Sequence, residues 1–170
     1  MDLPRKWYAA YTHPRQEKKI ASDLTNMGIE NYLPLTTTLR QWSDRKKKVV
    51  EPMIRSYIFV HVTELEMTPV RFVPGVVRYI PFRGKPVSIP DYQIQNLRIL
   101  EGSELPFTPE NQMLVQGEKV RITAGPLTGL RGTIVRTGNK SKLWITITAL
   151  HYHLTVDIVD AYVEKDPEQE

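Results

Sequence analysis

The chain of 170 residues contains no cysteine, so it cannot form a disulfide framework, a thiolate metal site or a cysteine nucleophile. Long apolar runs are also missing. No stretch approaches the roughly 18 apolar residues that cross a bilayer, and the N-terminus lacks the apolar core of a signal peptide. These absences predict a cytoplasmic protein that has no membrane partner.

Recognisable catalytic motifs are absent as well. There is no Walker loop or Rossmann fingerprint, and Ser43, Ser56 and Ser88 lie in no nucleophile motif. His151 and His153 are two residues apart and would share one face of a strand, a spacing that can hold a metal ion. No carboxylate nearby completes such a site. We therefore predict a protein without catalytic residues, metal or cofactor.

The net charge of +4 hides an asymmetry between the two halves of the chain. Residues 1–102 contain 16 Lys and Arg against 10 Asp and Glu, whereas residues 103–170 contain 7 against 9. The first half therefore carries +6 and the second −2. This favours nucleic acid as a partner of the first half and argues against the second half binding nucleic acid by charge alone.

The first half alternates strand and helix signals. Residues 7–11 are typical of a short buried strand, and Pro14 suits the first position of a helix that Gly28 would end. Residues 32–34 and 36–42 predict strands, and a charged tip, SDRKKK, follows them. Val49 and Val50 then lead into residues 54–62, so we expect a β-hairpin with a basic tip that leads into a central strand. Further expected elements are a short helix over 64–72, strands over 76–80 and 86–89, and a helix from Asp91 to Gly102.

The second half has only short strand signals after a stretch with two prolines and little periodicity. About five strands in some 50 residues are typical of a small barrel. We expect them over residues 120–123, 132–136, 143–148, 154–158 and 162–163.

A glycine-rich turn between two of these strands carries the most specific motif. Residues 117–135, GEKVRITAGPLTGLRGTIV, place Gly125, Pro126, Gly129 and Gly132 so that the backbone can turn tightly. This segment resembles the KOW module at the C-terminus of the NusG family of transcription elongation factors. The segments WYAAYTHPRQEKKI, EPMIRSYIFV and VPGVVRYI resemble the family's opening strand and helix, its central strand and its late Pro-Gly-Val turn, in the family's order.

The resemblance covers nearly the whole chain and implies an α+β fold. It implies an N-terminal α/β sandwich over 1–102, with an antiparallel sheet and flanking helices, a linker over 103–114, a five-stranded SH3-like KOW β-barrel over 115–165, and a tail over 166–170. It also implies a monomeric elongation and antitermination factor that binds the RNA polymerase clamp and suppresses pausing and termination.

In the family an apolar depression of the first domain binds the clamp helices. By motif position its lining here would be Tyr11, Ile54, Tyr57, Phe59 and Tyr79. Alternation supports part of this set, because Tyr57 and Phe59 fall on one face of a strand and Ile58 and Val60 on the other. The alternative is that all five belong to the core of a small sandwich.

Two further groups are candidates for binding non-template or upstream DNA. The resemblance places the first group at the start of the first helix. The alternative, which is equally favoured by charge, is that these residues only form a solvated helix face. The group comprises His13, Arg15, Gln16 and Lys19. The other is a basic cluster at the expected hairpin tip, which could approach phosphates without a shape requirement or serve only solubility. It comprises Arg45, Lys46, Lys47 and Lys48.

Departures from the family pattern indicate a specialised paralogue, similar to RfaH or the UpxY antiterminators of long polysaccharide operons. Ile54, Arg55 and Ser56 replace the usual phenylalanine, proline and glycine, and Leu127 replaces a phenylalanine. The alternative is a KOW-containing protein that binds RNA or the ribosome. A KOW barrel that holds RNA is usually basic, so the charge of −2 favours a protein partner for the barrel. In the family such a partner can be a small-subunit ribosomal protein.

Overall fold

The computed structural model describes residues 3–112, 117–159 and 162–169. The chain divides into two compact units, Met1–Ile89 and Pro90–Glu170. Each unit contains antiparallel sheet and at least one helix, so the predicted α+β class is confirmed. The units are described separately below.

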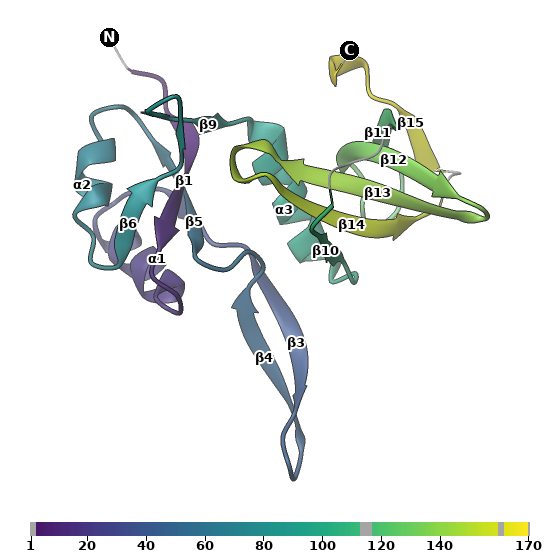
Figure 1. Ribbon diagram of the computed structural model, residues 1–170, viewed down its shortest axis with the longest axis horizontal. Coiled ribbons are helices and arrows are strands. Elements are labelled where there is room, and N and C mark those ends of the chain that lie inside the picture. Colours follow the sequence, from purple (N-terminus) through teal and green to yellow (C-terminus); the bar gives the residue numbers. More distant parts are fainter. Residues whose placement is uncertain (1–2, 113–116, 160–161, 170) are drawn as a thin grey trace. The chain divides into compact units, whose positions relative to one another are not determined.

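The first unit is built on an antiparallel sheet in the order β2-β5-β1-β6, with β9 also paired to β1 (Figure 1). Alternate residues of β1 and β5 pack against apolar residues of the helices, because side chains of a strand point to opposite faces in turn. This helix-side core includes Tyr8, Ile58, Val60, Ile20 and Leu24. The bounds are β1 (Lys6–Thr12), α1 (Glu17–Asn26), β2 (Asn31–Tyr32), β5 (Tyr57–Val62), α2 (Met67–Arg71), β6 (Val76–Tyr79) and β9 (Ser88–Ile89).

Two helices of this unit are shorter than predicted. Helix α1 begins at Glu17 and not at Pro14, because Arg15 adopts a left-handed conformation (φ 66°) that breaks the helical path. Gly28, with φ 73°, lies just beyond the helix end, where glycine was expected. Helix α2 spans only Met67–Arg71, within the predicted 64–72.

Two hairpins extend the first unit. Strands β3 (Leu35–Gln41) and β4 (Lys46–Pro52) form a separate two-stranded ribbon that projects away from β1 and β5 (Figure 1). Lys46, Lys47 and Lys48 therefore lie on a strand, and only Arg45 of the basic cluster is in the turn region. Strands β7 (Pro81–Phe82) and β8 (Lys85–Pro86) join through Arg83 and Gly84, and these two turn residues have positive φ.

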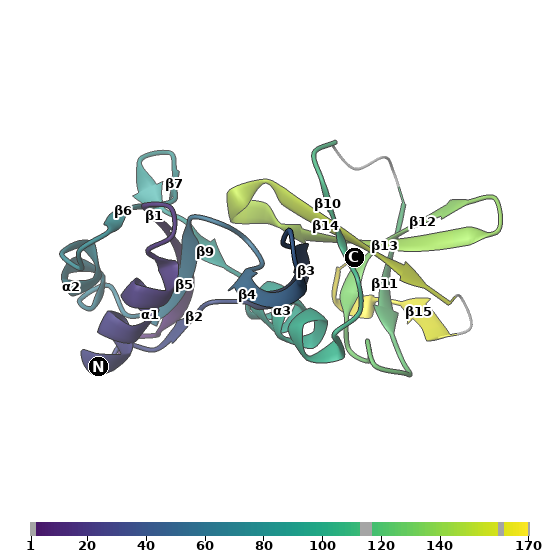
Figure 2. The same ribbon diagram turned by 90° about the horizontal axis from the view of Figure 1, so that it is seen from below.

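The second unit contains one antiparallel sheet in the order β10-β14-β13-β12-β11-β15 (Figure 2). The five predicted strands all form. A sixth strand, β10 (Thr108–Glu110), pairs with β14 inside the segment 103–114 that was expected to be a linker. The remaining bounds are β11 (Glu118–Ile122), β12 (Arg131–Thr137), β13 (Lys140–Ile147), β14 (Tyr152–Ile158) and β15 (Val163–Lys165), with short 3-10 helices over Thr148–Leu150 and Pro167–Gln169.

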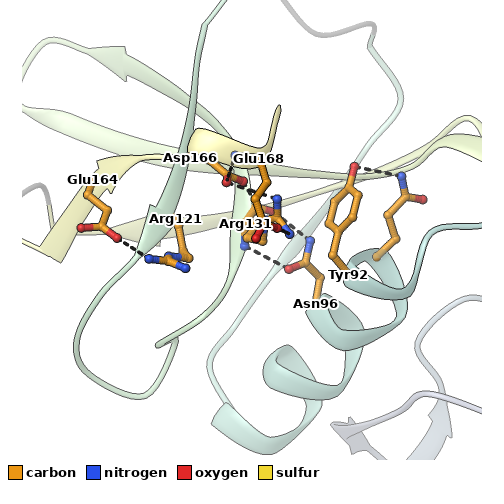
Figure 3. Close-up of polar contacts among 8 residues, drawn as sticks. Tyr92, Asn96, Arg121, Arg131, Glu164, Asp166 and Glu168 are labelled. Atoms are coloured by element: carbon orange, nitrogen blue, oxygen red, sulfur yellow. Dashed lines mark hydrogen bonds and ion pairs between the residues drawn. The ribbon is translucent and has the colours of Figure 1, made fainter. Parts of the chain in front are cut away.

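Helix α3 (Asp91–Ser103) also belongs to the second unit, although the sequence placed the boundary after residue 102. Two buried amide side chains fasten it to the sheet. Asn96 accepts a hydrogen bond from the backbone N–H of Arg131 (3.0 Å) and donates one to the Arg131 carbonyl (2.8 Å), as Figure 3 shows. Gln93 accepts a hydrogen bond from the backbone N–H of Thr148 (3.1 Å). The sequence pattern missed these contacts because both residues are polar.

The predicted tail, 166–170, begins with a buried residue and is not free. The Asp166 carboxylate accepts hydrogen bonds from Nε of Arg131 at 2.6 Å and from its Nη2 at 3.2 Å (Figure 3). Burial alone would raise the pKa of Asp166, but the Arg131 guanidinium and the Glu168 backbone N–H outweigh burial and lower it. The guanidinium also lies over the Tyr92 ring, 4.7 Å from its centroid, so this pair links β12, α3 and the C-terminal segment.

Within the residues that the structure describes, no helix is long and apolar enough to cross a membrane.

Candidate binding surfaces

The sheet of the first unit has a second face that is rich in aromatic residues. In the β1–β5 ladder Trp7 lies opposite His61, Ala9 opposite Phe59, and Tyr11 opposite Tyr57. Residues that pair directly share a side of the sheet, and this side is the one turned away from Tyr8, Ile58 and Val60. We call it the aromatic face.

Of the predicted lining residues on the aromatic face, only those at the Tyr11 end reach solvent. Tyr11 and Tyr57 are each half-buried, and their ring centroids lie 5.5 Å apart with the planes tilted by 58°. Phe59 lies on the same face but has 0% of its surface exposed. Ile54, in the turn before β5, is also buried. These two residues support the surface but offer no exposed area.

Tyr79 does not line the aromatic face, contrary to the prediction. It pairs with Ala10, whose side of the sheet is the helix-side core, and its ring meets Tyr8 edge-on at 6.1 Å. Its hydroxyl donates a hydrogen bond to the Met67 carbonyl at 3.0 Å, and burial raises its pKa. The motif correctly placed Tyr79 in a strand but put its side chain on the wrong face of the sheet. A shift of one residue along a strand moves a side chain to the opposite face.

Sequence reasoning missed a cation at the open end of the aromatic face. Tyr11 pairs with Tyr57 on one side and with Arg78 of β6 on the other, so the three residues form a row across three strands. Arg78 is exposed. We call Tyr57, Tyr11 and Arg78 the Tyr11 row. The sequence did contain a signal for this: Arg78 and Tyr79 are neighbours in a predicted strand, so their side chains should point to opposite faces.

Trp7 and His61 were also missed at the other end of the face. Their rings stack at 4.8 Å with an interplanar angle of 18°, and His61 Nδ1 lies 2.6 Å from Oε2 of Glu30. The alternation of Trp7, Ala9 and Tyr11 along β1 could have identified the whole face.

The four predicted residues around the start of α1 are all exposed. Gln16 N–H donates to the His13 carbonyl (3.3 Å) and His13 N–H to the Gly75 carbonyl (2.9 Å), which ties this loop to the turn before β6. Lys19 is paired with Asp23 at 3.1 Å. The buried carboxylate of Glu17 occupies the first turn and accepts a hydrogen bond from the Ser56 backbone N–H (2.8 Å). This negative charge weakens the case for a phosphate at the helix start.

All four members of the basic cluster are exposed, and none has an ion pair within the described part of the chain. Nearby, Glu51 of β4 binds two arginines, Arg40 at 2.9 Å and Arg55 at 3.3 Å. Burial would raise the pKa of Glu51, but the Thr38 hydroxyl and these guanidiniums together lower it. The hairpin base thus has a carboxylate between its two arginines, whereas the four cations of the basic cluster have no such partner among the described residues.

The glycine-rich turn has a structural role. Gly125 and Gly129 have φ of 84° and 89°, which residues with a side chain rarely adopt, and Gly129 N–H donates to the Ile122 carbonyl at 2.8 Å. A Cβ on Gly132 would overlap the Trp144 carbonyl oxygen. Pro126 lies between Gly125 and the buried Leu127. The turn brings Leu127 and Leu130 into the core.

The two histidines of the second half do not share a strand face. His151 ends a 3-10 turn with φ 48°, whereas His153 lies in β14 with its Nδ1 3.0 Å from the Thr146 hydroxyl. In the described residues, no group of three metal-ligating side chains comes together.

Comparison with known proteins places this geometry in a family. Residues 5–98 match the family model described as NusG, transcription termination factor nusG. The transcription termination/antitermination protein NusG of Rickettsia felis is 22% identical over 156 residues, covering 85% of this chain and 81% of that protein. The protein of the same name from Rickettsia bellii is 20% identical, covering 95% and 90%. A solved structure of NusG from Thermotoga maritima shares the fold at a TM-score of 0.50 and 21% identity, covering 95% of this chain and 97% of that one.

Proposed function

Since the chain belongs to the NusG family of transcription termination and antitermination factors, we propose that it binds the clamp of RNA polymerase through the Tyr11 row. The observation that carries this proposal is the pair of half-buried tyrosines at one end of a sheet face on which Trp7, Ala9 and Phe59 are buried. Members of this family are transcription factors and not enzymes.

The chemistry of the Tyr11 row suits a helical protein partner. Tyrosine buries a large apolar ring at low conformational cost and keeps a hydroxyl for a hydrogen bond, which is why it is enriched at interfaces. Phe59 shares the aromatic face with the row, and Ile54 lies in the turn before β5. Both are buried, so neither adds exposed area to the row. The exposed Arg78 adds a positive charge at the edge, which complements an acidic partner surface.

Such binding requires no chemistry of the protein's own. A ligand that binds the closed clamp more tightly than the open clamp shifts the polymerase toward the closed state. We propose that this shift suppresses pausing and termination. The contact with upstream or non-template DNA would come from the basic cluster and from the exposed residues His13, Arg15 and Gln16.

We also propose that the protein serves a specific set of long operons, such as polysaccharide loci. Support comes from the turn before β5, where Ile54, Arg55 and Ser56 depart from the family pattern. Ser56 has φ 63°, the conformation that favours the usual glycine, and Arg55 is paired with Glu51. The departure therefore changes the side chains beside the Tyr11 row and keeps the glycine-type backbone.

For the second unit we propose a protein partner, such as a small-subunit ribosomal protein. The support is its charge: residues 90–170 contain 8 Lys and Arg against 11 Asp and Glu. A negative surface disfavours nucleic acid as the main partner.

The test is binding to purified RNA polymerase core and pause escape in an assembled elongation complex. The double variant Tyr11→Ala, Tyr57→Ala should lose on the order of 10- to 100-fold in affinity, since truncated aromatic residues at an interface centre commonly cost 2 kcal/mol or more. Faster pause escape should be lost in parallel.

The matched control is Phe72→Ala, which removes an aromatic ring that is 81% exposed at the end of α2, away from the Tyr11 row. This variant should bind and act as the unmodified protein does. Circular dichroism would show that both variants are folded. Equal binding by the double variant and the unmodified protein would exclude the Tyr11 row as the polymerase contact.

A further inference from the structure

The β3–β4 hairpin has two chemically different faces, which the sequence treated as one basic tip. Thr38 pairs with Val49, Arg40 with Lys47, and the backbone N–H of Trp42 donates to the Arg45 carbonyl at 2.8 Å. These pairs alternate with Leu39–Lys48 and Gln41–Lys46, and directly paired residues share a side. We call the side with Arg40, Trp42, Arg45 and Lys47 the Trp42 face.

Trp42 takes no part in a core, because 56% of its surface is exposed at the outer end of the ribbon. Exposing a large aromatic ring to water is unfavourable. An exposed ring that is surrounded by groups of one charge therefore indicates a binding surface. Its neighbours here are Arg45, across the hairpin end, and Lys47 on the same side.

The charge on the Trp42 face is available to a ligand. Arg40 is held by Glu51 at 2.9 Å, nearer the hairpin base. Arg45 and Lys47 have no ion pair among the described residues, and the nearest acidic residue in sequence, Asp44, is in the turn. The outer part of this face therefore combines one exposed ring with two unpaired cations.

We propose that the Trp42 face binds single-stranded nucleic acid, with an unpaired base stacked on the Trp42 indole and the flanking phosphates held by Arg45 and Lys47. A single strand exposes the π-face of each base, whereas a duplex hides it in the stack. Stacking and phosphate contacts both ignore the 2′-hydroxyl, so DNA and RNA strands should bind alike and with little sequence preference.

This inference rests on the proposed function only in taking nucleic acid as the partner of the hairpin. It requires no contact with polymerase, and it adds a base-stacking residue to what was predicted as a purely electrostatic contact. The clamp experiment and the experiment below can therefore fail independently.

The test is titration of the full chain with labelled single strands of deoxythymidine or uridine, about 12 nucleotides long, and with a duplex of equal length. At about 50 mM salt, where phosphate contacts are strong, both single strands should bind more tightly than the duplex and quench tryptophan fluorescence. Trp42→Ala should weaken single-strand binding about fivefold or more and remove the quenching, although Trp7 and Trp144 remain. Trp42→Phe should restore most of the affinity.

The hairpin offers a matched pair of charge variants. The double variant Arg45→Ala, Lys47→Ala should make the negative slope of log affinity against log salt concentration less steep by about 1.4. This is the change for two lost phosphate contacts with a single strand. Lys46→Ala, Lys48→Ala removes the same charge from the opposite face and should change the slope less and leave the quenching intact. Leu39→Ala, on that opposite face, should have no effect.

Four results would overturn the proposal: no oligonucleotide binding by the unmodified chain, unchanged single-strand binding by Trp42→Ala, tighter binding of the duplex, or equal losses in the two charge variants. The last result would mean that the hairpin acts only through its total charge. Absence of any oligonucleotide binding by the unmodified chain would exclude the site altogether.

Discussion

A single step along a strand decides the role of each tyrosine in the first unit. Tyr79 follows the exposed Arg78 in the chain, yet it is buried and its hydroxyl donates a hydrogen bond to the Met67 carbonyl. Tyr11 and Tyr57 are half-buried on the other face of the sheet. The family resemblance assigned all three to one surface. Strand alternation separates them, because side chains one residue apart point to opposite faces.

At the same scale, the Asp166 carboxylate gives a prediction with a defined pH dependence. Asp166→Asn should lower the free energy of unfolding by about 1–3 kcal/mol at pH 7. It removes the buried one of the two carboxylates, Asp166 and Glu168, that pair with the largely buried Arg131. The folded-state pKa of Asp166 is lowered, so its stabilisation is present above about pH 4 and is lost as the pH falls through that lowered pKa. In urea unfolding, the difference in free energy of unfolding between Asp166→Asn and the unmodified protein should be smaller at pH 3 than at pH 7.

The control for this prediction is Glu164→Gln. Glu164 lies 2.6 Å from Arg121, but both side chains are about half exposed (Figure 3). Exposed pairs of this kind contribute from nothing to about 1 kcal/mol. A loss for Glu164→Gln as large as that for Asp166→Asn would mean that burial of the Arg131–Asp166 pair does not matter.

Among the elements, α3 has the predicted bounds but lies in a different compact unit from the one to which the sequence assigned it. Its apolar spacing and bounds agree with the prediction from Asp91 to Gly102 within one residue. Its attachment to the second unit depends on Gln93 and Asn96, which hydropathy patterns count as surface positions. Buried amides that satisfy backbone groups carry no periodic signal.

Asn96→Ala should therefore loosen α3 from β12. The variant leaves the Arg131 backbone N–H and carbonyl without their partners, which should cost about 1–3 kcal/mol and raise hydrogen exchange of α3 amides. Gln95→Ala, an exposed position one residue earlier on the same helix, should change neither quantity measurably. Unchanged exchange in Asn96→Ala would show that these hydrogen bonds do not anchor the helix.

At the scale of the whole molecule, the division of the chain at residues 89 and 90 is itself testable. A fragment of residues 90–170 keeps the bonds of Gln93 and Asn96 and the Tyr92–Arg131 contact, whereas a fragment of 103–170 lacks them. The longer fragment should be more stable by about 2–4 kcal/mol at roughly 1 kcal/mol for each contact. Thermal and urea unfolding of the two fragments would measure this, and equal stability would support the boundary predicted near residue 102.

The amino-acid sequence by itself determined the α+β class, the order of most strands and helices, and the glycine turn at 125–132. These are local properties: periodicity, turn residues and positive-φ glycines act within a few positions of the chain. Tertiary structure decided which tyrosines stay open, how the basic cluster divides between two hairpin faces, and where α3 is fastened. Those outcomes depend on strand register and on hydrogen bonds between residues far apart in sequence, such as Asn96 with Arg131, and no local pattern encodes them.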